Sequence, residues 1–184
     1  MTGHRAAQLN FAIREAVPEM REVAEIHPTA GLEIRAVMFG AGAQWHMEEP
    51  VNIDSVIWRD VSADDNDDEA CDMGAAFRLA ARALHVPPMP RQAPPPVLAL
   101  VSGTQPTDDW RSGLRELAAT PWGSQAVRIA IPVGADADHG VLQEFLSNSE
   151  LRPLDSFAPR HIAAAIRWAE TVANPWPTDD VDVW

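Results

Sequence analysis

Pro96-Val-Leu-Ala-Leu-Val-Ser-Gly-Thr-Gln-Pro-Thr-Asp-Asp-Trp110 carries more information about the fold than any other part of this chain. Its apolar run, rich in Val and Leu, is typical of a strand that is buried on both faces. Small residues then make a turn, and a Thr-Asp-Asp trio opens a helix. The pattern predicts a parallel strand that delivers its loop to the carboxyl edge of a sheet, where α/β folds usually bind their ligands.

The segments on either side continue this alternation of strand and helix. Before the quoted stretch we expect a helix over 3–26, two neighbouring strands over 33–39 and 44–51, and a helix over 74–86. After it we expect a helix over 108–119, a strand over 126–133, a helix over 138–146, a short strand over 151–154 and a helix over 159–173. Such alternation predicts an α/β fold with a doubly wound, mostly parallel sheet and helices on both faces.

Prolines mark the irregular places in this pattern. Pro18 lies inside the first helix and removes a backbone donor, so we expect a kink near Arg14 or a local break. Residues 87–96 contain six prolines and predict an extended connection. The apolar stripe expected on the first helix consists of Leu9, Ile13, Val17, Met20 and Ala24. Residues 1–174 are expected to form one domain, and the acidic, Pro-rich residues 175–184 a flexible tail.

Composition narrows the function classes. With 27 acidic and 14 basic residues, the chain carries a net charge of −13, which argues against binding to nucleic-acid backbones. The single cysteine, Cys71, excludes an intramolecular disulfide and a cluster of thiolate metal ligands. The first residues contain no signal-peptide core, and no apolar run is long enough to span a membrane, so we expect a cytoplasmic protein.

Three motifs resemble the von Willebrand factor A domain, in particular its bacterial, TerY-like branch named after tellurium resistance. The quoted stretch is similar to the family's apolar strand followed by Ser/Thr-Asp-Gly-x-Pro-Thr-Asp. Cys71-Asp-Met-Gly-Ala-Ala-Phe77 resembles its Thr-x-Met/Leu-Gly-x-Ala segment, and Ile129-Ala-Ile-Pro-Val-Gly-Ala-Asp-Ala-Asp138 its strand with a Gly-x-Asp-Ala-Asp turn. The resemblance extends over roughly residues 1–173 and implies the family's Rossmann-like fold.

The resemblance also implies a metal site that this chain does not preserve. Family members commonly hold Mg²⁺ or Mn²⁺ with an Asp-x-Ser-x-Ser loop, a Thr and an Asp, because hard oxygen ligands suit these ions. Here Cys71 stands at the Thr position and Gly103, beside Ser102, at the Asp position. The loop itself is absent, since the chain begins where that loop normally ends. We therefore expect a degenerate, metal-independent member without a cofactor.

The family's first strand would lie centrally, between the strands expected here at 33–39 and 97–101. Its loss would leave two strand edges with unpaired hydrogen-bonding groups facing a gap. The true start could lie upstream, the two strands could pair directly, or a partner could fill the gap, including a second copy of this chain. The residues leave these alternatives open.

The predicted function is a non-enzymatic protein-interaction module. In one mechanism, the loops at the carboxyl ends of the strands bind a partner without metal; in the other, the sheet gap or the tail is the docking element. The candidate partner-binding residues are Cys71, Asp72, Ser102, Thr104, Thr107 and Asp108. The resemblance implies a serine/threonine kinase or a PP2C-like phosphatase as partner, in a bacterial stress response.

Other interpretations compete with this one. The module could instead depend on weakly bound Mg²⁺, with its Asp-x-Ser-x-Ser loop upstream of Met1, or the chain could be a small α/β hydrolase that uses Ser102. An EF-hand loop starting at Asp64 would need Gly and Glu where the chain has Glu69 and Ala75, so a solvated acidic loop is favoured. The simplest roles for Asp72 and for the Thr-Asp-Asp trio are to cap the helices that follow them. Cys71 is interpreted as a half-buried replacement for Thr.

Overall fold

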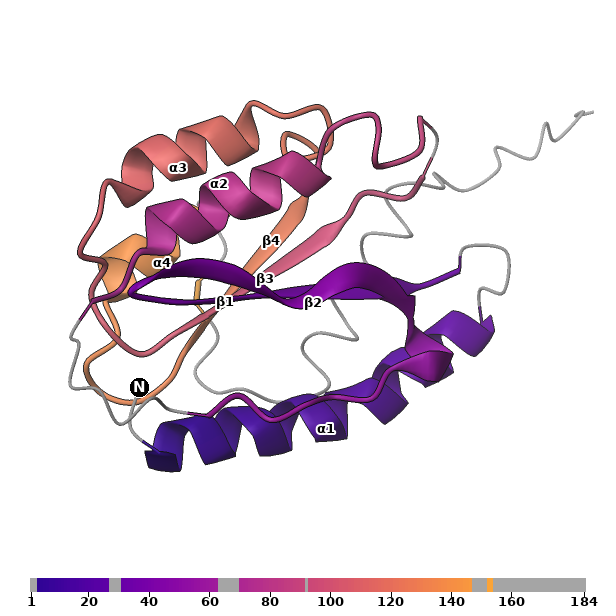
Figure 1. The fold of residues 1–184 in the computed structure, drawn as a ribbon, viewed down its shortest axis with the longest axis horizontal. Helices are drawn as coiled ribbons and strands as arrows, with labels where there is room; N and C mark the ends of the chain where they lie inside the picture. The colour runs from indigo at the N-terminus through magenta and orange to yellow at the C-terminus, as the bar shows by residue number, and fades with distance from the viewer. Residues whose placement is uncertain (1–2, 27–30, 63–69, 92, 147–151, 154–184) are drawn as a thin grey trace, which may run out of the picture.

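The computed structural model describes residues 3–26, 31–62, 70–91, 93–146 and 152–153 (Figure 1). Of the strand expected over 151–154, only the two central residues belong to these ranges. The helix expected over 159–173 and the tail 175–184 lie outside them.

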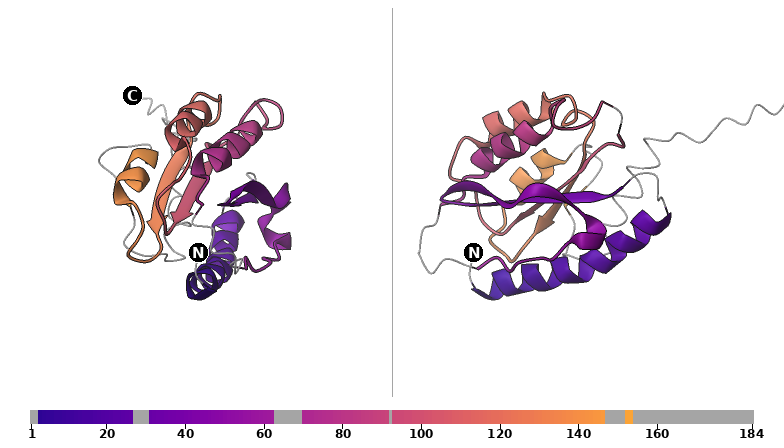
Figure 2. Two further views of the ribbon diagram at one scale, coloured as in Figure 1. Left: turned by 60° about the vertical axis from the view of Figure 1, so that its left-hand side comes forward. Right: turned by 45° about the vertical axis from the view of Figure 1, so that its right-hand side comes forward.

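The described residues form a mixed α/β structure. Its elements are α1 (Gly3–Ile26), β1 (Glu33–Gly40), β2 (Gly42–Asn52), the short 3₁₀ helix η1 (Ile53–Ser55), α2 (Met73–Ala83), β3 (Val97–Ser102), α3 (Trp110–Ala118), β4 (Val127–Pro132) and α4 (His139–Phe145). The strands lie between α2 and α3 on one side and α1 on the other (Figures 1 and 2). No helix in the described part of the chain is long and apolar enough to cross a membrane.

The strands are arranged as two separate pairs. β1 and β2 form an antiparallel hairpin in which Gly40 pairs with Gly42, and the φ of +87° at Gly42 requires a residue without a side chain. β3 and β4 are parallel, from Val97 opposite Val127 to Ser102 opposite Pro132. Within the described residues neither pair bonds to the other, so direct pairing of β1 with β3 is not found. A single doubly wound sheet therefore stays a prediction.

α1 has the predicted bounds and continues through Pro18, which excludes the local break. Its buried face differs in part from the expected stripe: Val17 and Met20 are buried, but Val23 takes the place expected for Ala24. Together with Ala16 these side chains pack against Ile53 and the inner side of the β1–β2 hairpin. Leu9 and Ile13 are only half-buried.

The chain that follows η1 runs along α1 and is held there by polar side chains of the helix. Arg21 donates to the carbonyl of Ile53 at 3.1 Å. Asn10 donates to the carbonyl of Val61 at 2.9 Å and accepts from the Val61 amide and from Trp58 Nε1. These bonds satisfy backbone groups for which the described part of the chain offers no partner strand.

α2 ends at Ala83 rather than near Val86, and this part of the prediction was wrong. Leu84 is the carboxyl cap, and the residues after it form turns in which the Met89 amide donates to the carbonyl of His85 at 2.9 Å. Pro87 explains the early end, since a proline disfavours helical backbone in the residue before it. The connection expected to be extended thus begins as a turn.

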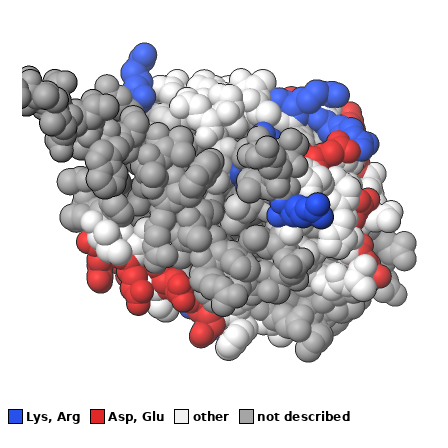
Figure 3. All heavy atoms as spheres, turned by 180° about the vertical axis from the view of Figure 1, so that it is seen from behind, with Lys and Arg blue, Asp and Glu red and all other residues white. Residues whose placement is uncertain are grey.

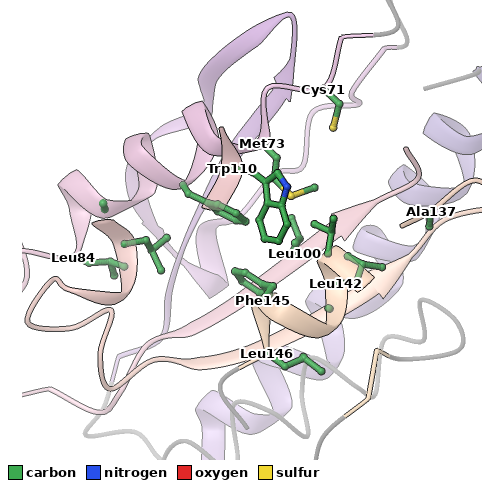
Figure 4. Close-up of a cluster of buried hydrophobic side chains, with 14 of the residues drawn as sticks. Cys71, Met73, Leu84, Leu100, Trp110, Ala137, Leu142, Phe145 and Leu146 are labelled. Atoms are coloured by element: carbon green, nitrogen blue, oxygen red, sulfur yellow. The ribbon is translucent and has the colours of Figure 1, made fainter. Parts of the chain in front are cut away.

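The largest core lies between the helices and β3–β4 (Figure 4). The indole of Trp110 points into its middle, toward Phe145 and Leu100, with Met73 beside it. The rings of Phe77 and Phe145 stack at a centroid distance of 5.4 Å, which joins α2 to α4.

α2 and α3 touch backbone to backbone. A Cβ placed on Gly113 would lie 2.5 Å from the carbonyl oxygen of Gly74, and one on Gly74 would lie 2.6 Å from that of Asp109. Both positions therefore require glycine because of a close approach, although neither has an unusual φ. The two helices are consequently fixed side by side, with their amino ends together.

We predict that Gly113→Ala destabilises the protein by about 1–3 kcal/mol, because the added methyl group forces the helices apart. This loss exceeds the gain of up to about 1 kcal/mol that alanine brings to a helix. Gly31→Ala is the control, since the nearest atom to its added carbon is Asn52 Nδ2 at 4.0 Å. Urea unfolding of the three proteins measures the difference; equal midpoints for Gly113→Ala and the natural chain would contradict the contact.

Candidate functional site

The six candidate residues come together at the carboxyl ends of β1 and β3. They belong to two segments, 70–72 and 102–108, which we call the loop cluster. The backbones of the segments are joined directly, because the Thr107 amide donates to the carbonyl of Cys71 at 3.0 Å. The amide of Cys71 in turn donates to Thr107 Oγ1 at 2.9 Å. The sequence thus grouped these residues correctly, while their binding role stays a prediction.

Asp108 caps α2, not the helix that follows it. Its carboxylate accepts from the amides of Gly74 and Ala75, each at 2.9 Å, and Arg78 lies 3.6 Å away. These amides belong to the first turn of α2, which has no carbonyl partners within the helix. The negative charge also lies at the positive end of the helix dipole. α3 is capped by the next residue, Asp109, which accepts from the amide of Ser112 at 3.2 Å.

Asp72 does not cap α2, so the simplest role assigned to it was wrong. It occupies the N-cap position, where its carbonyl accepts from the Ala76 amide at 3.2 Å, but its side chain makes no cap hydrogen bond. Its carboxylate instead accepts from the amide of Gly42 at 2.7 Å and from Thr107 Oγ1 at 3.4 Å. Its own amide donates to the carbonyl of Gly40 at 2.8 Å. The prediction missed this contact with the hairpin turn, although the Gly40-Ala-Gly42 segment could have indicated a tight turn with an exposed amide.

The thiol of Cys71 is buried, with 4% of the residue exposed. Burial raises its pKa, because the thiolate is poorly solvated there, and the negative charges of Asp108 and Asp72 act in the same direction. Hydrogen bonds with Thr104 and Ser102 oppose this rise. The buried, protonated state agrees with a structural replacement for Thr, more deeply buried than expected.

Ser102 and Gly103 are both enclosed. The Ser102 hydroxyl donates to the carbonyl of Thr104 at 3.2 Å, and the residue is 3% exposed. A Cβ on Gly103 would lie 2.5 Å from the carbonyl oxygen of Val133. Any larger residue, including the Asp that the resemblance implies, would require the end of β4 to move.

Two hollows lie away from the loop cluster. One, of about 440 Å³, opens between the carboxyl ends of α2 and α3 and is lined in part by Arg82, His85 and Glu116. Another, of about 210 Å³, lies beside the hairpin near His46 and Ile57. In the described residues, no three His, Cys, Asp or Glu side chains are arranged to hold a metal ion.

We predict that Asp108→Ala destabilises the protein by about 1–2 kcal/mol, because two α2 amides lose their acceptor. Hydrogen exchange locates the effect: the amides of Gly74 and Ala75 should exchange faster. Asp109→Ala is the matched variant and should accelerate Ser112 instead. If both variants affect the same helix, the assignment of the two caps is wrong.

We also predict that Cys71 reacts with iodoacetamide only at a higher pH than a cysteine in the urea-unfolded chain, because its pKa is raised. The neutral thiol contributes stability below the unfolded-state pKa, and this contribution is lost as the pH rises through the folded-state pKa. Above the unfolded-state pKa, the natural chain should therefore lose stability faster than Cys71→Ala. Equal alkylation profiles in the folded and unfolded chains would refute the raised pKa.

Comparison of the sequence with protein-family models and with curated proteins gives no match. The likeness to the von Willebrand factor A domain therefore rests on the three quoted motifs, and it stays a prediction.

Proposed function

We propose that this chain is a non-enzymatic protein-interaction module whose docking surface includes the loop cluster. The observation that carries the proposal is that polar side chains of this cluster are held by groups of neighbouring elements. Asp108 is fixed by α2, Asp72 by the hairpin turn, and Thr107 by Cys71. Such bonds create a surface of fixed shape, and a fixed surface loses little conformational entropy when it binds a partner.

The same bonds weigh against the hydrolase alternative. A serine nucleophile needs a base within hydrogen-bonding reach and access to a substrate. Ser102 is buried and its hydroxyl donates to a backbone carbonyl. These features support a structural role for the serine.

Metal dependence finds little support in the side chains present. Cys71 supplies a soft, protonated sulfur, and Gly103 has no room for a carboxylate. Asp72 and Asp108, the two carboxylates of the cluster, are already bound by backbone amides. The arrangement therefore favours binding by shape and hydrogen bonds, without Mg²⁺.

Charge is distributed unevenly over the surface that a partner would meet. Seen from behind, acidic side chains gather along the lower left edge, over α1, while basic and acidic side chains lie together at the upper right (Figure 3). α1 carries the acidic residues Glu15, Glu19, Glu22 and Glu25 and the basic residues Arg5, Arg14 and Arg21, so its carboxyl-terminal half is the more acidic one. A partner with a basic surface would be steered to this side of the molecule. The serine/threonine kinase or PP2C-like phosphatase that the resemblance implies remains part of this proposal.

The test is affinity capture with the full chain from its own host, with bound proteins identified by mass spectrometry. Gln105, an exposed residue of the loop cluster, is replaced in Gln105→Arg, and Ser124→Arg is the control at the opposite end of α3. We expect one dominant partner, bound at least about tenfold more weakly by Gln105→Arg and equally by the control. Turnover of a p-nitrophenyl ester that Ser102→Ala abolishes would overturn the proposal in favour of the hydrolase.

A further inference from the structure

We propose that β1 and β3 border a slot one strand wide, and that this slot binds an extended, apolar strand of another polypeptide. The inference rests on the proposed function and names the form of the partner. It follows from the hydrogen bonds of the two strand pairs and from the packing around them.

The two bordering strands run in the same direction. β1 ends at Gly40, whose carbonyl accepts from Asp72, and β3 ends at Ser102, just before the loop that bonds to Cys71. Both carboxyl ends therefore meet at the loop cluster. Each strand has a pairing partner on one edge only, β2 for β1 and β4 for β3, among the residues that the structure describes.

The segment Cys71–Asp72 shows how wide the slot is. On one side, Asp72 bonds to Gly40 and Gly42 at the end of the hairpin. On the other side, Cys71 bonds to the amide and hydroxyl of Thr107 in the loop after β3. A single chain segment thus bridges the two strand pairs at this end, with Cys71 bonding to one side and Asp72 to the other, before it turns at Asp72 (φ −81°, ψ 64°) into α2. Along the rest of β1 and β3, no segment in the described ranges bridges the two strand pairs in this way.

Both faces of the slot are covered by apolar side chains. On the α1 side, Ile34 of β1 and Val97 of β3 pack against the same buried cluster. On the other side, Phe39 and Leu98 pack against the core under α2 and α4. A strand in this position would be buried on both faces, and such strands are continuous apolar runs rich in Val and Ile.

The bordering strands are more exposed than strands in the middle of a sheet should be. β1 has no buried residue along its length, although helices lie on both of its sides. In β3 only Leu100 and Ser102 are buried, and Ala99 is exposed. Unpaired edge groups beside a shared core are a template for strand addition.

The first test is hydrogen exchange of the full chain alone, over a range of concentrations. We expect fast exchange for the amides in 34–39 and 97–101 that face the slot, since no strand among the described residues pairs with them on that edge. Slow exchange at all concentrations would mean that another segment of this chain fills the slot. Slow exchange only at high concentration would mean that a second copy fills it. Either result overturns the proposal.

The second test uses a displayed library of random peptides of about twelve residues, long enough for one strand. We expect selected peptides to share about five consecutive apolar, mostly β-branched residues. A synthetic peptide of the selected sequence should protect the amides of 34–39 and 97–101. No selection, or peptides without such runs, would overturn the inference.

A pair of variants then locates the binding. Ala99→Glu places a charge beside the bound strand but at a residue exposed in the free chain, so its melting temperature should change little. We expect it to weaken peptide binding at least about tenfold. Ala119→Glu, on an exposed position beyond α3, is the control and should bind as the natural chain does. Equal binding by Ala99→Glu would exclude the slot.

These outcomes separate the slot from the wider proposal. If the captured partner binds but protects only the loop cluster, the slot is excluded and the interaction module stands. If no partner is captured and no peptide is selected, both proposals fail.

Discussion

The carboxylate of Asp108 is the contact on which the arrangement of this protein depends. α2 begins without a capping bond from the residue before it, so its first amides rely on a side chain from the loop after β3. Buried helix ends need such partners, because an unpaired amide costs about 1–3 kcal/mol. The same loop reaches the helix only because Gly74 leaves room for the backbone of Asp109. The carboxylate of Asp108 and the lack of a side chain at Gly74 together determine where α2, α3 and β3 meet.

The capping of α2 by Asp108 instead of Asp72 has a second effect. Because Asp108 accepts from the first amides of α2, the carboxylate of Asp72 can accept from the Gly42 amide in the hairpin turn. The hairpin has no backbone pairing with β3–β4 in the described residues, so this bond is part of what holds the two strand pairs in place. Stability and the candidate docking surface therefore share the same residues, and changes in the loop cluster are expected to affect both.

Local sequence patterns predicted most helices and strands well, but they did not predict the contacts between these elements. The bounds of α1 and the strand at β3 follow from periodicity and from an apolar run rich in Val and Leu, which are properties of neighbouring residues. The cap of α2 comes from a residue far along the chain, so no nearby pattern shows it. The close approach at Gly103 was likewise visible only in space, although the sequence marked the position as unusual. The division into two strand pairs depends on what lies between them, which the pattern left open.

The segment Cys71–Asp72 limits the length of the slot in addition to separating the two strand pairs. It closes the slot where β1 and β3 finish, so a guest strand can extend along β3 for only about 20 Å, the length of six residues. At that point the guest must either terminate or turn sharply outward. The protein would thereby discriminate between guests by the position of their apolar run relative to a chain end or a tight turn, in addition to its composition.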